Sequence, residues 1–259
     1  MSDLLPRILF EKDPAMFRMD KDGQRRPDFN FCAHSPTAIA AICENAVKFA
    51  AALAPSSGRY FFWLDDAQPM CHCPSCRGLS DSDQALLLEN AMVKALRRHV
   101  RPDASLAHLA YLHTLAPPTQ VRPEPGVFLE YAPIQRQWSR PLSHLEVEGR
   151  SMGGMPALTH GRHLELLEAN LAVFDPSSAQ VLEYWLDVSL FSGYKRPPCK
   201  LPWARDVFLD DLRTYRGQGV RHITSFGAFL DAQYIQLYGE PPLNEYGEGL
   251  ETISREMKK

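Results

Sequence analysis

The chain has 259 residues, of which 45% are hydrophobic, so it contains enough apolar material to bury a sizeable core. Its formal net charge of −3 at pH 7 shows no excess of basic residues that would mark a nucleic-acid or anionic-membrane partner. The N-terminus lacks the basic and apolar regions of a secretory signal, and no continuous run of about 18 apolar residues follows it. We therefore expect no membrane association and a cytoplasmic location. An export segment upstream of this sequence would instead place the protein in the periplasm or outside the cell.

Segments typical of strands alternate with segments typical of helices along the chain. The expected strands are 28–32, 60–66, 105–114, 126–133, 180–190 and 220–226, and the expected helices are 36–54, 82–99, 162–173 and 204–218. This alternation predicts right-handed crossovers and a parallel sheet. About six βα units are visible where a (β/α)₈ barrel has eight, so we expect an α/β fold in which either two strands are missing upstream or the sheet is open. It should form one domain over residues 1–259, with residues 1–27 as an irregular N-terminal segment.

Acidic residues recur at the expected carboxyl ends of strands, where the active sites of parallel α/β folds collect. Asp65 and Asp66 follow one strand, and Glu130 lies near the end of another. In Gln180–Leu190, alternating side chains put Asp187 on one face near the strand end. Glycoside hydrolysis requires a carboxylic acid and a carboxylate, so we predict Asp66, Glu130 and Asp187 as catalytic residues.

Each of these acids also has a structural interpretation, because an acid at a strand end is often a helix N-cap, a turn former or half of an ion pair. Three strand ends with the same chemistry favour catalysis, although for any single residue both interpretations stay open. Neighbouring polar and aromatic side chains are expected to bind the sugar, and these are Asp65, Tyr111, His113, Trp138 and Trp185. For Trp185, as for Trp63, the alternative is burial in the core.

Three cysteines are clustered in the loop after the second expected strand. Cys71, Cys73 and Cys76 form the pattern C-x-C-x-x-C, which lets thiolates converge on one metal ion, but a structural zinc site needs a fourth ligand. We predict Cys32, which ends the preceding strand, because loops after neighbouring parallel strands share one edge of the sheet. Four protein ligands leave no position open for water, so this zinc would be structural.

Other interpretations of the cysteine loop stay open. His34 or His72 in place of Cys32 would give a site of three cysteines and one histidine. In an exported protein, two of the cysteines would favour a disulfide, and thiols without a function are a further alternative. A catalytic zinc is a further alternative, with Asp66 or His113 completing an open site.

Several segments of the chain share motifs with one known family. They are Asp13–Arg25, Phe31–Pro36, the Asp65-Asp66 pair, the C-x-C-x-x-C loop, Leu109–Thr114, Glu130–Pro133, Tyr184–Asp187 and Asp211–Val220. On these segments, the chain resembles a glycoside-hydrolase-like family of unassigned function that is related by fold to the α-glucuronidases and β-hexosaminidases. The resemblance implies a (β/α)₈ barrel and carbohydrate-related activity, so with about six βα units we expect a TIM-barrel-like fold that is incomplete. The chain departs from the family in having Asp13-Pro14 where the family has His-Pro, and in lacking sequence for an N-terminal β-rich domain and the first barrel strands.

We therefore expect a carbohydrate-active, glycoside-hydrolase-like domain that acts on a carbohydrate substrate. Asp66 and Glu130 would be its acid/base pair, and Asp187 would assist or replace one of them. The first rival hypothesis is a non-catalytic carbohydrate-binding or scaffolding module, and the second is a zinc-dependent hydrolase. The missing strands motivate the first rival hypothesis. An unclosed barrel also exposes the edges of its sheet, and we expect that a homo-oligomer would cover them.

Overall fold

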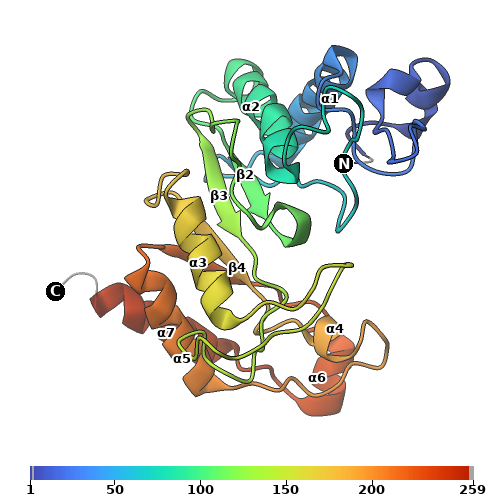
Figure 1. The fold of residues 1–259 in the computed structure, drawn as a ribbon. Coiled ribbons are helices and arrows are strands. Elements are labelled where there is room, and N and C mark those ends of the chain that lie inside the picture. Colours follow the sequence, from blue (N-terminus) through green and yellow to red (C-terminus); the bar gives the residue numbers. More distant parts are fainter. Residues whose placement is uncertain (2, 257–259) are drawn as a thin grey trace. The chain divides into compact units, whose positions relative to one another are not determined.

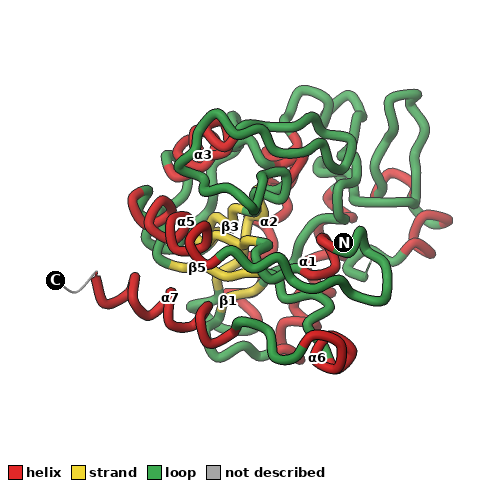
Figure 2. Tube along the Cα trace, turned by 90° about the horizontal axis from the view of Figure 1, so that it is seen from below, coloured by secondary structure: helices red, strands yellow, loops and turns green. Residues whose placement is uncertain are grey.

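The structure is a computed structural model that describes residue 1 and residues 3–256. The chain divides into two compact units. Unit 1 comprises the residues up to Tyr131 together with Ala169–Asp175, and unit 2 comprises Ala132–Glu168 and the residues from Pro176 onward. Figure 1 shows the helices and strands along the chain, and Figure 2 shows that loops and turns make up much of it.

Unit 1 contains three parallel strands. β1 (Arg59–Tyr60) pairs with β2 (Ser105–Ala110), which in turn pairs with β3 (Val127–Tyr131). All residues of β3 are buried, and the register places Leu109 of β2 opposite Glu130 of β3. The sheet therefore presents a buried carboxylate near the carboxyl end of its third strand.

Two long helices of unit 1, α1 (Pro36–Leu53) and α2 (Asp81–His99), pack against each other, and α2 also packs on β2. The helix α1 begins where the Ser35 hydroxyl accepts a hydrogen bond from the Ala38 N–H at 3.3 Å. A capping box starts α2, because the side chains of Ser80 and Asp83 each accept a hydrogen bond from the other residue's N–H. Both starting points are thus fixed by residues that are visible in the sequence.

Among the described residues, α1 is the one helix that has the length and composition to cross a membrane. The sequence was expected to contain no such segment. Length and apolar composition are shared by membrane spans and by helices of folded domains. In unit 1, Ala38, Ile42, Ala46 and Ala50 form a buried face of α1, as in a packed helix.

The N-terminal part of unit 1 consists of short elements. It contains the 3₁₀ helices η1 (Arg7–Glu11) and η2 (Pro14–Met16), and an antiparallel bridge joins Met19 to Arg25. A third 3₁₀ helix, η3 (Leu112–Thr114), follows β2. The N-terminal elements place Met16 and Met19 next to the cysteines described below, because the Cys32 N–H donates to the Met16 carbonyl and the His72 N–H donates to the Met19 carbonyl.

Unit 2 contains two parallel strands and most of the remaining helices. β4 (Gln180–Glu183) pairs with β5 (His222–Ser225), and the helices α5 (Arg205–Gly217) and α7 (Leu243–Glu256) pack together. The remaining helices that carry residues of this unit are α3 (His160–Leu171), α4 (Val188–Phe191) and α6 (Ala232–Tyr238). One apolar cluster of unit 2 is formed by Leu186, Val188, Leu201 and Tyr234.

The expected helices are confirmed to within a few residues, but several expected strands are shorter or absent. Residues 28–32 do not form a strand, because Asn30 adopts a left-handed conformation (φ 46°) and its backbone N–H bonds to a loop carboxylate. The expected strand 60–66 is reduced to β1. The expected strand 180–190 ends at Glu183, because Asp187 caps the short helix α4.

The expected strand 105–114 ends at Ala110, where η3 follows, and the expected strands 126–133 and 220–226 lose residues at both ends. The α/β class with parallel strands is confirmed, since every pairing between the five strands described within the units is parallel. The (β/α)₈ barrel and the single domain stay predictions.

Candidate metal centre and carboxylate sites

Four cysteine thiols lie together in unit 1, and all four residues are buried. The Sγ atoms of Cys32, Cys71, Cys73 and Cys76 lie within 4.8 Å of one another. Cys32 Sγ lies 3.7 Å from Cys73 Sγ and 3.9 Å from Cys76 Sγ, whereas a disulfide bond is about 2.05 Å long. Four thiolates at about 2.3 Å from one tetrahedral zinc ion would be about 3.8 Å apart. The cluster expected from the spacing is present, with Cys32 as its fourth member, and is compatible with a metal site.

Backbone hydrogen bonds fix each arm of the cluster. The Cys32 N–H donates to the Met16 carbonyl at 2.9 Å, which attaches this residue to the N-terminal turns. The N–H groups of Cys76 and Arg77 both donate to the Cys73 carbonyl, at 2.9 and 3.0 Å, and so form the tight turn between two cysteines of the cluster. The Cys71 N–H donates to the Gln84 side chain of α2 at 3.1 Å. The thiols are thus held by the start of α2 and by the N-terminal segment.

Hydrogen-bond donors surround the Cys71 thiol, although the neighbouring Cys32 raises the pKa of Cys71. The N–H groups of Met19 and Cys73 lie 3.3 and 3.5 Å from Cys71 Sγ, and the Arg25 guanidinium lies 3.8 Å from the same atom. Hydrogen bonds from Cys71 and Cys76 lower the pKa of Cys32, and the Cys32 thiolate then raises the pKa of Cys76. The first thiol therefore loses its proton readily, and its negative charge disfavours deprotonation of the next thiol. A bound cation would offset this repulsion between thiolates.

The two histidines weighed as fourth ligands lie outside the group of four. His34 has an exposed side chain whose Nδ1 lies 3.3 Å from Cys76 Sγ, which is the distance of a hydrogen bond to a ligand. His72 donates its backbone N–H to the Met19 carbonyl at 2.8 Å. The fourth member of the cluster is therefore Cys32, and His34 lies beside one of its thiols.

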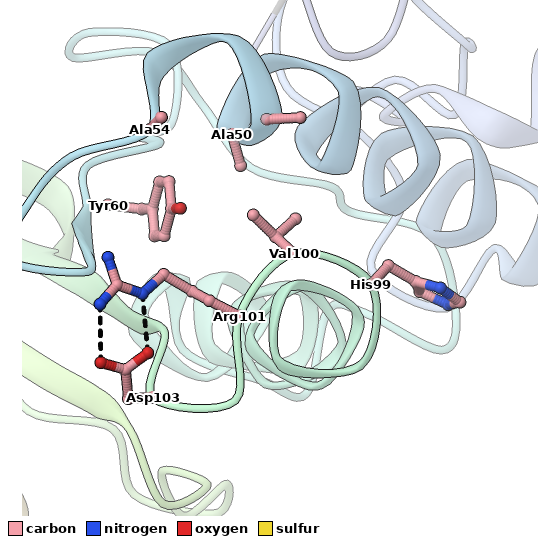
Figure 3. A pocket seen from close by; sticks show the side chains of 8 residues that line it. Ala50, Ala54, Tyr60, His99, Val100, Arg101 and Asp103 are labelled. Carbon is pink, nitrogen blue, oxygen red and sulfur yellow. Dashed lines mark hydrogen bonds and ion pairs between the residues drawn. The ribbon is translucent and has the colours of Figure 1, made fainter.

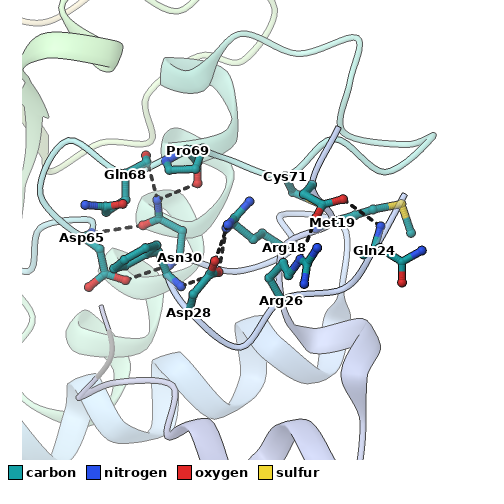
Figure 4. A network of polar contacts seen from close by, with 12 residues as sticks. Arg18, Met19, Gln24, Arg26, Asp28, Asn30, Asp65, Gln68, Pro69 and Cys71 are labelled. Carbon is teal, nitrogen blue, oxygen red and sulfur yellow. Dashed lines mark hydrogen bonds and ion pairs between the residues drawn. The ribbon is translucent and has the colours of Figure 1, made fainter. Parts of the chain in front are cut away.

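The loop that carries Asp65 and Asp66 lies directly before the cysteines (Figure 4). Asp65 Oδ2 accepts a hydrogen bond from the Asn30 N–H at 2.7 Å, and the Asp65 N–H donates to Asn30 Oδ1 at 3.0 Å. The amino group of Met1 lies 3.0 Å from Asp65 Oδ1. Asp66 is exposed at the turn that follows, next to Ala67 with φ 51°. Asp65 is therefore engaged within the loop, and Asp66 faces solvent.

Glu130 is a buried carboxylate near the end of β3. The Trp63 indole N–H donates to Glu130 Oε2 at 2.8 Å, and Glu130 is only 1% exposed. Trp63 belongs to the segment that follows β1, so this bond joins the ends of two strands within unit 1. Arg59 of β1 lies with its guanidinium 3.7 Å from the centre of the Phe128 ring.

Tyr111 and His113 both lie after β2 in unit 1. The Tyr111 N–H donates to the Thr114 hydroxyl at 3.2 Å at the start of η3. His113 Nδ1 lies 3.9 Å from the Asp81 carboxylate, and burial raises the pKa of Asp81. Neither residue belongs to the group of four thiols, so neither completes a metal site there.

Asp187, Trp138 and Trp185 lie in unit 2, and all three are buried. Asp187 accepts hydrogen bonds from the Ser189 hydroxyl at 2.5 Å and the Leu190 N–H at 3.2 Å, which is the N-cap geometry named above as its structural interpretation. The Trp138 and Trp185 rings donate their N–H groups to Glu183 and Asp211, at 3.3 and 2.9 Å. These tryptophans are core residues in unit 2, and their sugar-binding role stays a prediction.

A fully buried ion network lies around these tryptophans and was not anticipated from the sequence. Arg136 Nη1 lies 2.8 Å from Glu183 Oε1 and 2.6 Å from Asp211 Oδ2, and all three side chains are 0% exposed. The Tyr215 hydroxyl donates a further hydrogen bond to Glu183. Burial raises the pKa of Asp211 to about 6, although Arg136 opposes this shift. Since every partner lies in the interior of unit 2, we assign this network a structural role.

One cavity of about 570 Å³ lies in unit 1, at the ends of α1 and α2 that precede β1 and β2 (Figure 3). It is lined by Ala50, Ala51, Ala54, Tyr60, His99, Val100, Arg101 and Asp103. Arg101 and Asp103 form a two-bond ion pair at its rim, with both distances at 2.7 Å. None of the candidate catalytic, sugar-binding or metal-binding residues lines this cavity.

Comparisons with curated proteins and with solved structures found no match. A family match covers residues 2–151, which include the N-terminal segment, the four clustered cysteines, Asp65, Asp66 and Glu130. The description of the family assigns no activity, so the glycoside-hydrolase-like function stays a prediction. Because the match spans more than half of the chain, this protein belongs to the DUF4838 family, a domain of unknown function.

Proposed function

We propose that Cys32, Cys71, Cys73 and Cys76 bind one zinc ion, and that this ion is structural. The observation that carries the proposal is the group of four buried Sγ atoms within 4.8 Å, with two measured separations close to those of a tetrahedral site. Four thiolates leave no coordination position for a substrate or water, so this arrangement argues against the hypothesis of a zinc-dependent hydrolase. The N–H groups and Arg25 around Cys71 would offset the negative charge of the four thiolates.

Metal analysis tests this proposal. We expect one zinc ion per chain in the purified protein, and a Cys73→Ser variant that retains little or none. Cys43→Ser is the matched control, since Cys43 is a partly buried cysteine of α1 outside the cluster and should leave the zinc content unchanged. A wild-type protein purified without metal, which takes up none on titration with zinc, would refute the site.

We propose further that the protein is a carbohydrate-active, glycoside-hydrolase-like domain with a TIM-barrel-like fold. Asp66 and Glu130 would act as acid and base, and Asp187 would assist or replace one of them. Support comes from the resemblance of the sequence motifs and from two positions in unit 1, because Glu130 lies near the carboxyl end of β3 and Asp66 lies in the segment that follows β1. The exposed Asp66 and the buried Glu130, to which Trp63 donates, differ in environment as an acid/base pair requires.

Hydrolysis of a panel of aryl glycosides tests this activity. We expect Glu130→Gln and Asp66→Asn each to lower kcat by at least about 100-fold, since general acid/base groups contribute about 10²–10⁴-fold. The matched control is Glu124→Gln, which removes only an exposed ion pair with Lys94 at 2.7 Å. Full activity in both carboxylate variants would overturn the assignment. Binding of an oligosaccharide without turnover by the wild type would favour the non-catalytic carbohydrate-binding module.

A further inference from the structure

We propose that Asn30 is a positioning residue that couples the metal centre to the Asp65-Asp66 loop. The inference rests on the zinc site proposed above. It extends that proposal, because the metal would then fix the position of the Asp65-Asp66 loop as well as stabilise the fold. It starts from a coincidence of spacing: Asn30 lies two residues before Cys32, and Pro69 lies two residues before Cys71.

The side chain of Asn30 connects these two segments. Its Nδ2 donates to the carbonyls of Gln68 and Pro69, at 3.2 and 3.1 Å, and its Oδ1 accepts from the Asp65 N–H at 3.0 Å. Figure 4 shows the amide of Asn30 between these partners. One side chain therefore holds the loop on both sides of Asp66, at Asp65 and at Gln68.

The position of Asn30 is itself well determined. The residue is 3% exposed, and its left-handed backbone (φ 46°) turns its N–H toward Asp65 Oδ2 at 2.7 Å. Asp28, two residues earlier, accepts a hydrogen bond from Arg18 Nε at 2.8 Å and one from the Phe29 N–H at 2.8 Å. Asn30 is thus held between an ion pair on one side and a cysteine of the cluster on the other.

The geometry explains how the metal would act on the loop. Binding of Cys32 and Cys71 to one ion fixes the distance between the segments Asn30–Cys32 and Pro69–Cys71. The three hydrogen bonds of the Asn30 amide need that distance, because a hydrogen bond weakens steeply once its geometry is lost. Loss of the metal frees the two segments, so the amide bonds and the fixed position of Asp66 are lost together.

Hydrogen exchange of the Asp65 amide, followed in the peptide that covers residues 61–70, tests the coupling, because this N–H donates to Asn30 Oδ1. In the zinc-loaded wild type we expect slow exchange, and removal of zinc with a chelator should accelerate it by about tenfold or more, as expected when buried hydrogen bonds are lost. Asn30→Gly removes the amide but tolerates the left-handed backbone. This variant should keep one zinc ion per chain, exchange fast in the 61–70 peptide, and show no further acceleration with chelator.

The matched control is Asn90→Ala. Asn90 fixes another loop of unit 1 in the same manner, with its Nδ2 donating to the Arg122 carbonyl and its Oδ1 accepting from the Glu124 N–H, both at 2.8 Å. This variant should leave the exchange of residues 61–70 and its response to chelator unchanged. Zinc-loaded Asn30→Gly that exchanges as slowly as the wild type would overturn the coupling but not the zinc site. Failure of the wild type to bind zinc would overturn both.

Discussion

The indole N–H of Trp63 donates a hydrogen bond to the Glu130 carboxylate across 2.8 Å, and it links the segment after β1 to the end of β3. The Glu130 side chain is almost fully buried, so the bond satisfies an acceptor that water does not reach. Within unit 1, this contact connects the aromatic segment after β1 to a candidate catalytic acid.

Trp63→Phe should therefore destabilise the protein by about 1–3 kcal/mol, the cost of leaving a buried acceptor without its donor. Urea unfolding measures this change. The matched control is Trp203→Phe, because the Trp203 N–H donates to Glu245 at 3.1 Å and the Glu245 side chain is 46% exposed. Since water can replace that donor, the control should lose less stability. Equal losses in the two variants would contradict the assigned role of Trp63.

Replacement of Arg136 by methionine should cost about 3–5 kcal/mol of unfolding free energy. The change leaves the carboxylates of Glu183 and Asp211 buried without their cation. Arg162→Met is the control, because Arg162 pairs with Glu165 on an exposed helix face and should change stability by less than about 1 kcal/mol. A loss below 1 kcal/mol in Arg136→Met would show that the network is not a structural element of unit 2.

We expect the buried His163 side chain to make the unfolding free energy of the protein fall in acid. Burial lowers its pKa from 6.5 to about 3, with the Arg136 charge adding to the shift. Above pH 6.5 the side chain is neutral in both the folded and the unfolded state. Below that pH only the unfolded chain takes up the proton, so the contribution of this group falls by up to about 1.4 kcal/mol per pH unit until about pH 3.

The measurement for His163 is the unfolding free energy between pH 7 and pH 4.5. His163→Gln cannot titrate, so its stability should decline less steeply with falling pH than that of the wild type. His99→Gln, which alters an exposed histidine, should keep the wild-type slope. Identical slopes for the wild type and His163→Gln would disprove the assignment to His163.

We expect Asp83 to stabilise both the start of α2 and the loop at residues 119–121. Its Oδ1 accepts hydrogen bonds from the N–H groups of Thr119, Gln120 and Val121, at 3.0, 2.8 and 2.8 Å, in addition to its part in the Ser80 capping box. Asp83→Ala should cost about 2 kcal/mol or more, above the usual cost of about 1 kcal/mol for a lost cap.

Hydrogen exchange locates the effect of Asp83→Ala, since the amides of residues 119–121 should exchange faster. Asp81→Ala, which changes an acid in the same helix turn outside the capping box, should leave those amides protected. Unchanged protection in Asp83→Ala would contradict the proposed link between the helix start and the loop.

Only part of the four-cysteine cluster follows from local sequence. Cys32 was predicted as the end of a strand, whereas the structure brings it to the cluster from a segment that forms no strand. The other three members could be predicted because their information is local, since Cys71, Cys73 and Cys76 lie on one loop. The helices were predictable for the same reason, from their caps and periodicity. Asn30 could have been suspected from Asn-x-Cys beside the acidic loop, but its left-handed backbone carries no clear sequence signature.

The strand ends and the buried network could not be predicted in this way. The alternation of apolar and polar side chains continues beyond Glu183, yet the strand ends there because Asp187 caps a helix. A two-residue hydrophobic period cannot reveal that a helix cap competes with the strand. Arg136 meets its partners 47 and 75 residues further along the chain. Nothing local marks an arginine as buried, since arginine is ordinarily exposed.

The most direct test of the account is X-ray absorption spectroscopy at the zinc edge of the purified protein, together with its metal content. We predict one zinc ion per chain with four sulfur neighbours at about 2.3 Å. In Cys32→Ser, the first shell should contain at most three sulfur atoms. A first shell of nitrogen and oxygen atoms in the wild type, or a disulfide between Cys32 and Cys73 with no bound metal, would contradict the central claim.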